Sequence, residues 1–460
     1  MCLREEGLAR VEQIRVIRGF RVIGQFNSGR WRGRFGQWAL VGLIPLSAAC
    51  GNADGAREVE IRFWAMGAEG EQVAKLVPQF ERENPGIRVR VQQIPWTAAH
   101  EKLLTAHVGK STPDVAQLGN TWIPEFEALG ALRALGTLIE TSSVIDQESF
   151  FPGIWATNVV DDTVYGIPWY VDTRVLFYRK DLLAQAGWRE MPTTWADWRR
   201  AMEDIKRTVG KDRWAIFLPT NEWAQPAILG MQAGSPILKD GGRWGAFSDP
   251  EFMRALEFYL GLYRDGLAPV YGNTDVANLF QEFERGLFVF YITGPWNIGE
   301  FGRRLPDELQ DDWATAPLPG PTGPASGLST AGGSSLVLFR ESEHPDEAWK
   351  FIEFMSRPEI QVRFYQLTGD LPPRLEAWED TVLSRNDKAR AFREQLDRVQ
   401  PVPLVPEIEL IMAKLIEYAE QSIRGGVPPA DAMRRLDAEV NTILEKRRWM
   451  LERRIARAAP

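Results

Sequence analysis

The feature that most constrains the fold is an alternation of strand and helix patterns along the chain. Residues 59–64 alternate apolar and polar side chains, as in a strand, and residues 73–80 then place apolar side chains at helical spacing. A second strand pattern at 87–91, a helix pattern at 97–109 and a strand pattern at 113–119 complete the first series. Such alternation is typical of an open, mostly parallel α/β sheet with helices on its faces.

The alternation returns in the second half of the chain. Further strands are predicted at 175–178, 214–218, 287–292 and 335–339, and further helices at 194–210, 249–266, 346–355 and 407–455. About 410 residues follow Cys50, which is more than the roughly 250–300 that one core supports, so two domains are expected. The only cysteines are Cys2 and Cys50, so the part after Cys50 must be stabilised by packing.

A secretory signal is predicted at the start of the chain, over residues 1–49. An apolar stretch at 38–49 follows three arginines between residues 30 and 34 and precedes Cys50. It is too short to span a bilayer, which needs about 20 apolar residues. The sequence around Cys50 resembles a bacterial lipobox, in which the cysteine becomes the acylated N-terminus after cleavage. We therefore predict an extracytoplasmic protein that a lipid at Cys50 anchors to a bacterial membrane; the alternative is ordinary cleavage without acylation.

Charge is divided unevenly between the signal and the rest of the chain. Residues 1–49 hold eight arginines and three acids, and the whole chain has a net charge of −8, so residues 50–460 carry about −13. An acidic body argues against a nucleic-acid partner, for which a basic surface is expected. The first thirty residues contain acids and no apolar run, so translation is expected to begin further downstream, for example at Val16 or Val22.

Ten short motifs occur in an order and spacing that resemble one known family. They are GKSTPDV at 109–115, GALRAL at 130–135, YGIP at 165–168, FYRKDL at 177–182, TTWADW at 193–198, GPW at 294–296, APLP at 316–319, GG at 332–333, AWKFI at 348–352 and GDLP at 369–372. From residue 57 to about 425 the chain resembles the extracellular solute-binding proteins of sugar ABC importers, the family that includes maltodextrin- and trehalose-binding proteins.

The resemblance implies a two-lobed periplasmic-binding-protein fold of type II. Each lobe would be an open, mostly parallel sheet flanked by helices, and a hinge would close the lobes on a ligand in the cleft. It implies an N-lobe of 57–171 plus 336–369 and a C-lobe of 172–335 plus 370–460. The implied function is binding of a neutral di- or oligosaccharide and its delivery to the permease subunits of an ABC importer. A monomer without cofactor, metal or catalytic activity is expected.

Sugar binding requires carboxylates and amides against hydroxyls and an aromatic ring against an apolar ring face. The chain has eighteen tryptophans, and Trp296 follows a predicted strand in a Gly-Pro-Trp loop, where the family stacks sugar. Its alternative role is a core residue. Asp172 lies at the expected crossing between lobes and can accept hydroxyl groups, or it can pair with Arg174 and only stiffen the hinge.

The remaining candidates should border the cleft, because ligands of open α/β sheets bind beyond the carboxyl ends of the strands. They are Trp64 and Glu69 after the first strand, Asn120 and Thr121 after 113–119, Asn221, Glu222 and Trp223 after 214–218, Gly333 with its backbone N–H, and Arg374 with its guanidinium. Two have clear alternatives: Glu69 as an acid stabilising a helix N-terminus, and Arg374 in a salt bridge.

Other classes of function remain open at this point. The same fold can bind glycerol-phosphate, a polyamine or a metal chelate, although a phosphate would favour clustered basic residues at a helix N-terminus. A secreted carbohydrate-active enzyme is the other alternative. The three histidines show no metal-ligand spacing, and no Gly-x-Ser-x-Gly or Walker motif occurs. Departures from the maltodextrin-binding pattern in the first loop and after residue 114 argue against maltodextrin itself and leave a disaccharide such as trehalose or a short glycoside open.

Overall fold

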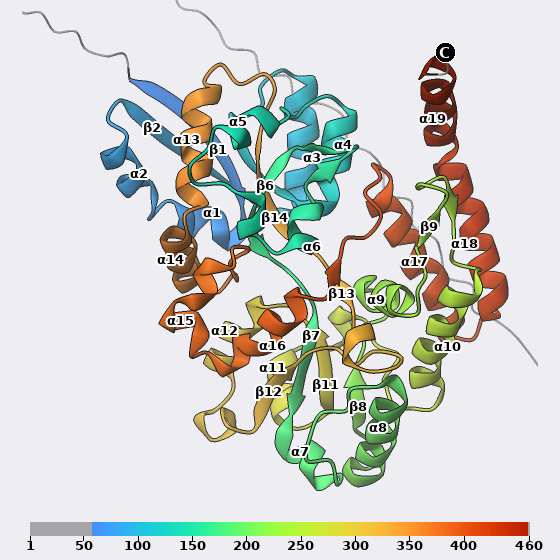
Figure 1. The fold of residues 1–460 in the computed structure, drawn as a ribbon. Coiled ribbons are helices and arrows are strands. Elements are labelled where there is room, and N and C mark those ends of the chain that lie inside the picture. Colours follow the sequence, from blue (N-terminus) through green and yellow to red (C-terminus); the bar gives the residue numbers. More distant parts are fainter. Residues whose placement is uncertain (1–57, 459–460) are drawn as a thin grey trace, which may run out of the picture. The chain divides into compact units, whose positions relative to one another are not determined.

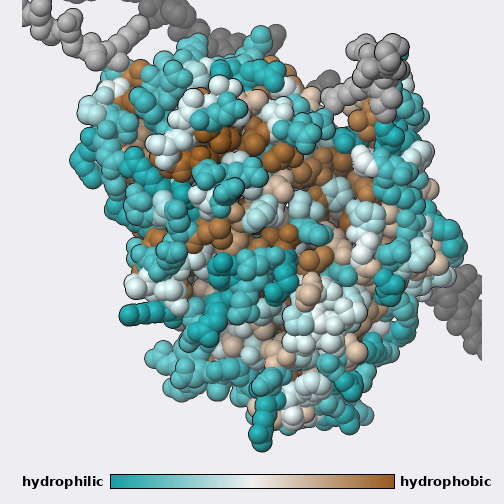
Figure 2. Space-filling view, viewed as in Figure 1, coloured by the Kyte–Doolittle hydropathy of each residue, from teal (hydrophilic) through white to brown (hydrophobic). Residues whose placement is uncertain are grey.

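The computed structural model describes residues 58–458, so the predicted signal and Cys50 lie outside the described residues. The part from Gly55 onward forms one compact unit that contains two large β-sheets (Figure 1). Figure 2 shows the same view of the surface, with hydrophilic side chains at the edges of this face and apolar side chains towards its middle. The predicted α/β architecture with two separate sheets is confirmed.

The first lobe contains a five-stranded sheet in the order β2-β1-β3-β14-β6. Its strands are β1 (Val59–Met66), β2 (Ile87–Ile94), β3 (Val115–Gly119), β6 (Gly166–Val171) and β14 (Gly333–Leu338). Its helices are α1 (Gly67–Val73), α2 (Val77–Glu83), α3 (Trp96–Val108), α4 (Ile123–Ala128), α5 (Gly136–Glu140), α6 (Pro152–Ala156), α13 (Pro345–Met355) and α14 (Pro358–Thr368). Strand β1 pairs in parallel with β2 and β3, whereas β14 is antiparallel to both β3 and β6. Four of the five strands therefore run in one direction.

The second lobe contains a four-stranded sheet in the order β12-β7-β11-β8. Its strands are β7 (Val175–Arg179), β8 (Trp214–Phe217), β11 (Phe288–Thr293) and β12 (Trp313–Ala316). Its helices are α7 (Lys180–Gln185), α8 (Trp195–Val209), α9 (Ala224–Gln232), α10 (Pro250–Arg264), α11 (Leu279–Glu284), α12 (Trp296–Arg304), α15 (Thr381–Ser384), α16 (Asp387–Leu396), α17 (Ile408–Ile423), α18 (Pro429–Ile443) and α19 (Glu445–Ala458). Only β7 is reversed relative to the other three strands, but because it lies between β12 and β11, two of the three pairings are antiparallel. Most strands of each sheet run in one direction, as predicted, while the pairings in both sheets are mixed.

The reversed strands are the ones that follow a passage between the sheets. Strand β6 ends at Val171 in the first sheet, and β7 begins at Val175 in the second. The chain returns through the two-residue strand β13 (Ser329–Thr330) to the reversed strand β14. A strand that leaves the gap between the sheets must run opposite to the strands that end there. The carboxyl ends of the other strands therefore face this gap, where ligands of open α/β sheets bind. The lobe boundaries implied by the resemblance stay a prediction.

Short two-stranded pairs and helices complete the described chain. The pairs are β4 (Val159–Val160) with β5 (Thr163–Val164), β9 (Leu238–Lys239) with β10 (Trp244–Gly245), and β13 with β15 (Val399–Gln400). The segment 407–455 is largely helical, as predicted, with one break between Ile423 and Pro429 and a second at Leu444. In residues 58–458, no helix combines the length and the apolar character that crossing a membrane requires.

Helix α8 shows how the local sequence decides the packing of the second lobe. The Thr194 hydroxyl accepts a hydrogen bond from the Asp197 N–H and caps the helix, which stops before Gly210 at a φ of +90°. Trp195 and Trp198 are buried against the sheet, as expected for core residues. Arg199 lies one turn after Trp195, at the edge of this buried face, and its side chain is 30% exposed.

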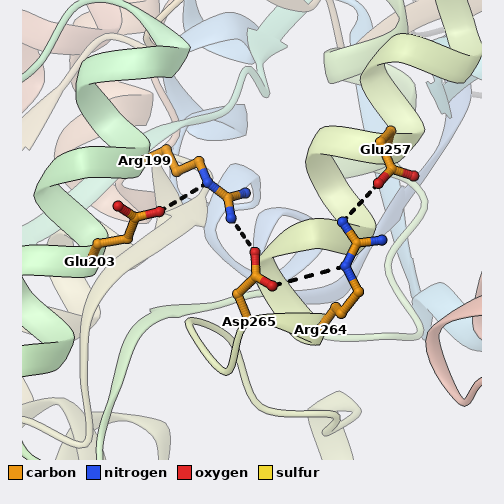
Figure 3. Close-up of polar contacts among 5 residues, drawn as sticks. All are labelled: Arg199, Glu203, Glu257, Arg264 and Asp265. Atoms are coloured by element: carbon orange, nitrogen blue, oxygen red, sulfur yellow. Dashed lines mark hydrogen bonds and ion pairs between the residues drawn. The ribbon is translucent and has the colours of Figure 1, made fainter.

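An ion-pair chain joins the outer faces of α8 and α10 (Figure 3). Arg199 pairs with Glu203 on its own helix at 3.1 Å and with Asp265 beyond the end of α10. Arg264 pairs with Glu257 at 2.7 Å and lies 3.9 Å from Asp265. All these side chains are at least 30% exposed, so each pair is expected to contribute less than about 1 kcal/mol.

Two neighbouring positions on α8 test this division between core and surface. Trp198→Ala is expected to lower the free energy of unfolding by about 3–5 kcal/mol, because it leaves a cavity in the core. Arg199→Gln is the matched control and is expected to cost less than about 1 kcal/mol. Urea denaturation followed by circular dichroism measures both. Equal losses for the two variants would contradict the packing described here.

Candidate functional site

A cavity of about 490 Å³ opens between the two lobes at the strand ends. Both lobes, the crossing after β6 and the later segments around residues 370 and 402 contribute to its wall. It is lined by Glu69, Trp96, Gly119, Asn120, Thr121, Trp122, Tyr170, Val171, Asp172, Arg174, Trp223, Ala224, Pro295, Trp296, Thr330, Ala331, Gly332, Gly333, Ser334, Asp370, Val402 and Glu409.

Aromatic side chains face the cavity from both lobes. On the first lobe, Trp96 and Trp122 meet edge to face with ring centroids 5.8 Å apart, and Trp96 is 37% exposed. On the second lobe, Trp223 precedes α9, and Trp296 begins α12 with 41% of its surface exposed. Exposed indole rings on opposite walls can hold a flat apolar ligand face between them.

The position of Trp296 depends on the glycine two residues before it. A Cβ atom at Gly294 would lie 1.9 Å from the Trp296 ring, so the ring occupies space that any other residue would fill. The Asn297 amide donates to the Thr293 hydroxyl at 2.7 Å and ties the start of α12 to the end of β11. The Gly-Pro-Trp sequence therefore places the indole in the cavity.

A buried hydrogen-bond network holds Glu69 at the cavity wall of the first lobe. The Tyr170 hydroxyl donates to the Glu69 carboxylate at 3.0 Å and accepts from the Gln117 amide at 2.9 Å. The Ser334 hydroxyl lies 3.0 Å from the same Tyr170 oxygen. Gln117 in turn accepts from the Met66 N–H at 2.7 Å, at the end of β1. The position of the Glu69 carboxylate is thus fixed by hydrogen bonds that involve four strands, β1, β3, β6 and β14.

Four carboxylates line the cavity: Glu69, Asp172, Asp370 and Glu409. Arg174 is the one basic residue among the described residues of the lining, and it is paired with Asp172. Burial raises the pKa of Glu69, and it raises the pKa of Asp172 despite the opposing effect of Arg174. Burial, with the nearby charges of Glu69 and Asp172, raises the pKa of Asp370 to about 7. Near neutral pH Asp370 is therefore only partly ionised, and it can donate a hydrogen bond in its protonated form and accept one in its ionised form.

The cavity brings together seven of the eleven residues that the sequence singled out. They are Glu69, Asn120, Thr121, Asp172, Trp223, Trp296 and Gly333. The Asn120 amide is used within the protein, because it donates to the Thr157 hydroxyl and accepts from Ser335 at 3.4 Å. Gly333 has a φ of +132°, and a Cβ there would lie 2.1 Å from the Tyr170 carbonyl oxygen, so only glycine permits this close approach.

Arg374 lies outside the cavity, which corrects the expectation that it contacts a ligand. Its side chain donates to the carbonyl oxygens of Val144 at 2.7 Å and Ser356 at 3.2 Å. It also pairs with Glu376 at 2.9 Å. The guanidinium is engaged in these contacts within the protein, which agrees with the alternative that Arg374 forms a salt bridge.

Three further candidates also lie away from the cavity. Side chains alternate between the faces of β1, so Trp64 packs towards α3, where Lys102 lies 4.9 Å from its ring centroid. Asn221 and Glu222 instead hold a neighbouring loop: Asn273 donates its N–H to Asn221 at 2.8 Å and its amide to Glu222 at 3.3 Å. These residues support the walls of the second lobe and do not line the cavity.

The sequence reasoning missed several residues of the lining. Trp96 follows the end of β2 by two residues, so the same strand-end argument that found Glu69 could have found it. Glu409 comes from α17 and accepts a hydrogen bond from the Thr121 hydroxyl of the first lobe. No local pattern relates residues so far apart in the chain. Within residues 58–458, no three His, Cys, Asp or Glu side chains are grouped to hold a metal ion.

The raised pKa of Asp370 gives a test of the site's electrostatics. Its ordinary value is 3.8, so between about pH 4 and 7 the folded state binds more protons than the unfolded state, and stability falls as pH rises. Asp370→Asn cannot ionise, so its gain in melting temperature over the wild type is expected to be larger at pH 8 than at pH 5. Asp387→Asn, at a side chain 78% exposed, is the control and should give the same difference at both values. A gain for Asp370→Asn that does not depend on pH would contradict this assignment.

Comparison with known proteins agrees with this geometry. The family whose sequence model matches residues 65–362 is described as bacterial extracellular solute-binding protein. The solved structure of the sugar-binding protein MalE from Xanthomonas citri is 48% identical, with a TM-score of 0.83, over 86% of this chain and 99% of that chain. The diacetylchitobiose-binding protein DasA of Streptomyces coelicolor is 26% identical over 87% of this chain and 96% of its own length. The galactooligosaccharide-binding protein of Bacillus subtilis is 23% identical over 86% and 93% of the two chains. The chain therefore belongs to the bacterial extracellular solute-binding proteins.

Proposed function

We propose that the protein binds a di- or oligosaccharide in the interlobe cavity, outside the cytoplasm, and delivers it to the permease of an ABC importer. The observation that carries the proposal is one cavity with exposed tryptophans on both walls and carboxylates between them. The Xanthomonas citri, Streptomyces coelicolor and Bacillus subtilis relatives, which are named for sugar or oligosaccharide binding, support it. The cavity volume of about 490 Å³ lies within the range of about 300–1,000 Å³ usual for small-molecule sites.

The chemistry of the wall suits a saccharide because each group has a complementary partner on a sugar. Trp296 and Trp96 present ring faces and edges to the C–H surface of pyranose rings, and Glu69 and Asp172 accept hydrogen bonds from hydroxyls. Closure of the lobes would exclude water, so each hydroxyl left unpaired would cost about 1–3 kcal/mol. Selectivity for one arrangement of hydroxyls follows from this cost.

We propose an uncharged saccharide in preference to an anionic solute. A phosphate would meet four carboxylates and a single arginine that is already paired with Asp172. A polyamine is the second candidate, because four carboxylates and several aromatic rings also suit a long cation. Titration with saccharides and with spermidine distinguishes a saccharide ligand from a polyamine.

The remaining parts of the proposal concern the setting of the protein. We propose that it acts as a monomer tethered through a lipid at Cys50, a residue outside the described part of the chain. We further propose that it releases its ligand unchanged. The family is one of binding proteins, and chromatography of the saccharide after prolonged incubation with the protein tests the absence of catalysis.

Isothermal titration with maltose, trehalose, N,N′-diacetylchitobiose, spermidine and glycerol 3-phosphate tests the proposed ligand class. At least one of the saccharides is expected to bind, and Trp296→Ala should weaken that binding about tenfold or more through loss of ring stacking. The matched control is Trp244→Ala, because Trp244 is 38% exposed but lies on the β9–β10 pair away from the cavity. Binding of spermidine alone would support the polyamine candidate, and a saccharide affinity unaffected by Trp296→Ala would contradict the site.

A further inference from the structure

The Arg174 side chain contacts two of the residues that are proposed to hold a sugar, Trp296 and Asp172. The Arg174 guanidinium lies over the Trp296 ring, with its central carbon 4.7 Å from the ring centroid. The same guanidinium pairs with the Asp172 carboxylate. All three residues line the cavity. An arginine stacked on an indole covers the ring surface that a pyranose would use.

The backbone at Arg174 is held in place, so only its side chain is free to move away. The Arg174 N–H donates to the Ser329 hydroxyl at 3.1 Å, and that hydroxyl donates back to the Arg174 carbonyl oxygen at 2.9 Å. Ser329 belongs to β13 and is completely buried. This double contact pins the crossing segment to the second lobe. The Arg174 side chain is 16% exposed and reaches the cavity surface.

The indole is also held in place, because Gly294 and the Asn297–Thr293 hydrogen bond define its position at the start of α12. A ligand that stacks on this face of the ring must therefore displace the guanidinium that lies over it. The other cation–aromatic contacts of described tryptophans involve Trp64, Trp214, Trp244, Trp313 and Trp449, none of which lines the cavity. Among the described cavity tryptophans, this arrangement is confined to Trp296.

We propose that Arg174 is an internal competitor of the ligand: saccharide binding exchanges the Arg174–Trp296 stack for a sugar–Trp296 stack. The inference rests on the proposed function of the same cavity and adds a device that sets its affinity. Without ligand, the guanidinium lies over one face of the Trp296 ring and pairs with Asp172. The ligand must displace the guanidinium, and the guanidinium returns when the ligand leaves. A partly exposed cation–aromatic contact lowers the apparent affinity about two- to thirtyfold.

The change in affinity caused by one substitution distinguishes a competitor of the ligand from a residue that contacts the ligand. Removing a competitor raises the affinity, whereas removing a contact lowers it. Arg174→Gln is expected to raise the affinity for the binding saccharide, among maltose, trehalose and N,N′-diacetylchitobiose, about two- to thirtyfold in isothermal titration. The gain should vanish when Trp296→Ala is also present, because no ring face is then left to uncover. Arg174→Lys keeps the charge beside Asp172 but loses the flat guanidinium, so a smaller gain in the same direction is expected. Arg264→Gln, in the exposed ion pairs of Figure 3, is the control and should leave the affinity unchanged.

A measurement without ligand provides an independent readout. Acrylamide quenching assigned to Trp296, obtained as the difference between each protein and its Trp296→Phe derivative, should be stronger in Arg174→Gln than in the wild type. Three results would each contradict the proposal that Arg174 competes with the ligand: weaker saccharide binding by Arg174→Gln, a gain in affinity that persists in Trp296→Ala, or unchanged quenching. None of these results would contradict the proposed function. Failure of all three saccharides to bind the wild type would overturn both proposals together.

Discussion

The passage of the chain from β6 into β7 is the constraint on which the rest of the structure depends. Val171 ends a strand of the first sheet, and Val175 begins a strand of the second. Because β7 and β14 leave this gap, they run against their neighbours, and the other strands of the two sheets end there. The loops that follow β1, β2, β3, β8 and β11 then contribute to the cavity wall. Asp172 and Arg174 lie within the passage itself, so they belong to both the connection and the site.

Ion pairing and hydrogen bonding offset the repulsion among the carboxylates that line the cavity. Four carboxylates in one partly closed space would repel one another if all were ionised and unpaired. Arg174 neutralises Asp172, Tyr170 donates to Glu69, and Thr121 donates to Glu409. Burial and the charges of Glu69 and Asp172 raise the pKa of Asp370 to about 7. A wall of this kind disfavours anions and offers many acceptors, which is the basis of the proposed preference for an uncharged, hydroxyl-rich ligand.

The sequence predicted the two-sheet architecture and seven of the 22 residues that line the cavity, because both predictions could start from local patterns. Alternating strands reveal where loops begin, and the strand-end rule then led to Glu69, Thr121 and Trp296. The same rule failed for Trp64, because a strand's pattern does not say which of its two faces meets the ligand. It failed for Arg374, whose partners Val144 and Ser356 are recruited by tertiary folding. Glu409 reaches Thr121 only through the packing of α17, which no local pattern encodes.

Hydrogen exchange followed by mass spectrometry, with and without saturating saccharide, tests most directly whether the ligand occupies the cavity between the lobes. The account predicts slower exchange in three separate segments at once, namely 119–122, 170–174 and 294–297, because they meet only at this cavity. The surface formed by Trp64 and residues 101–106 of α3, which lies away from the cavity, should exchange at an unchanged rate. Protection confined to one lobe, or protection at Trp64 without any at 170–174, would contradict the account.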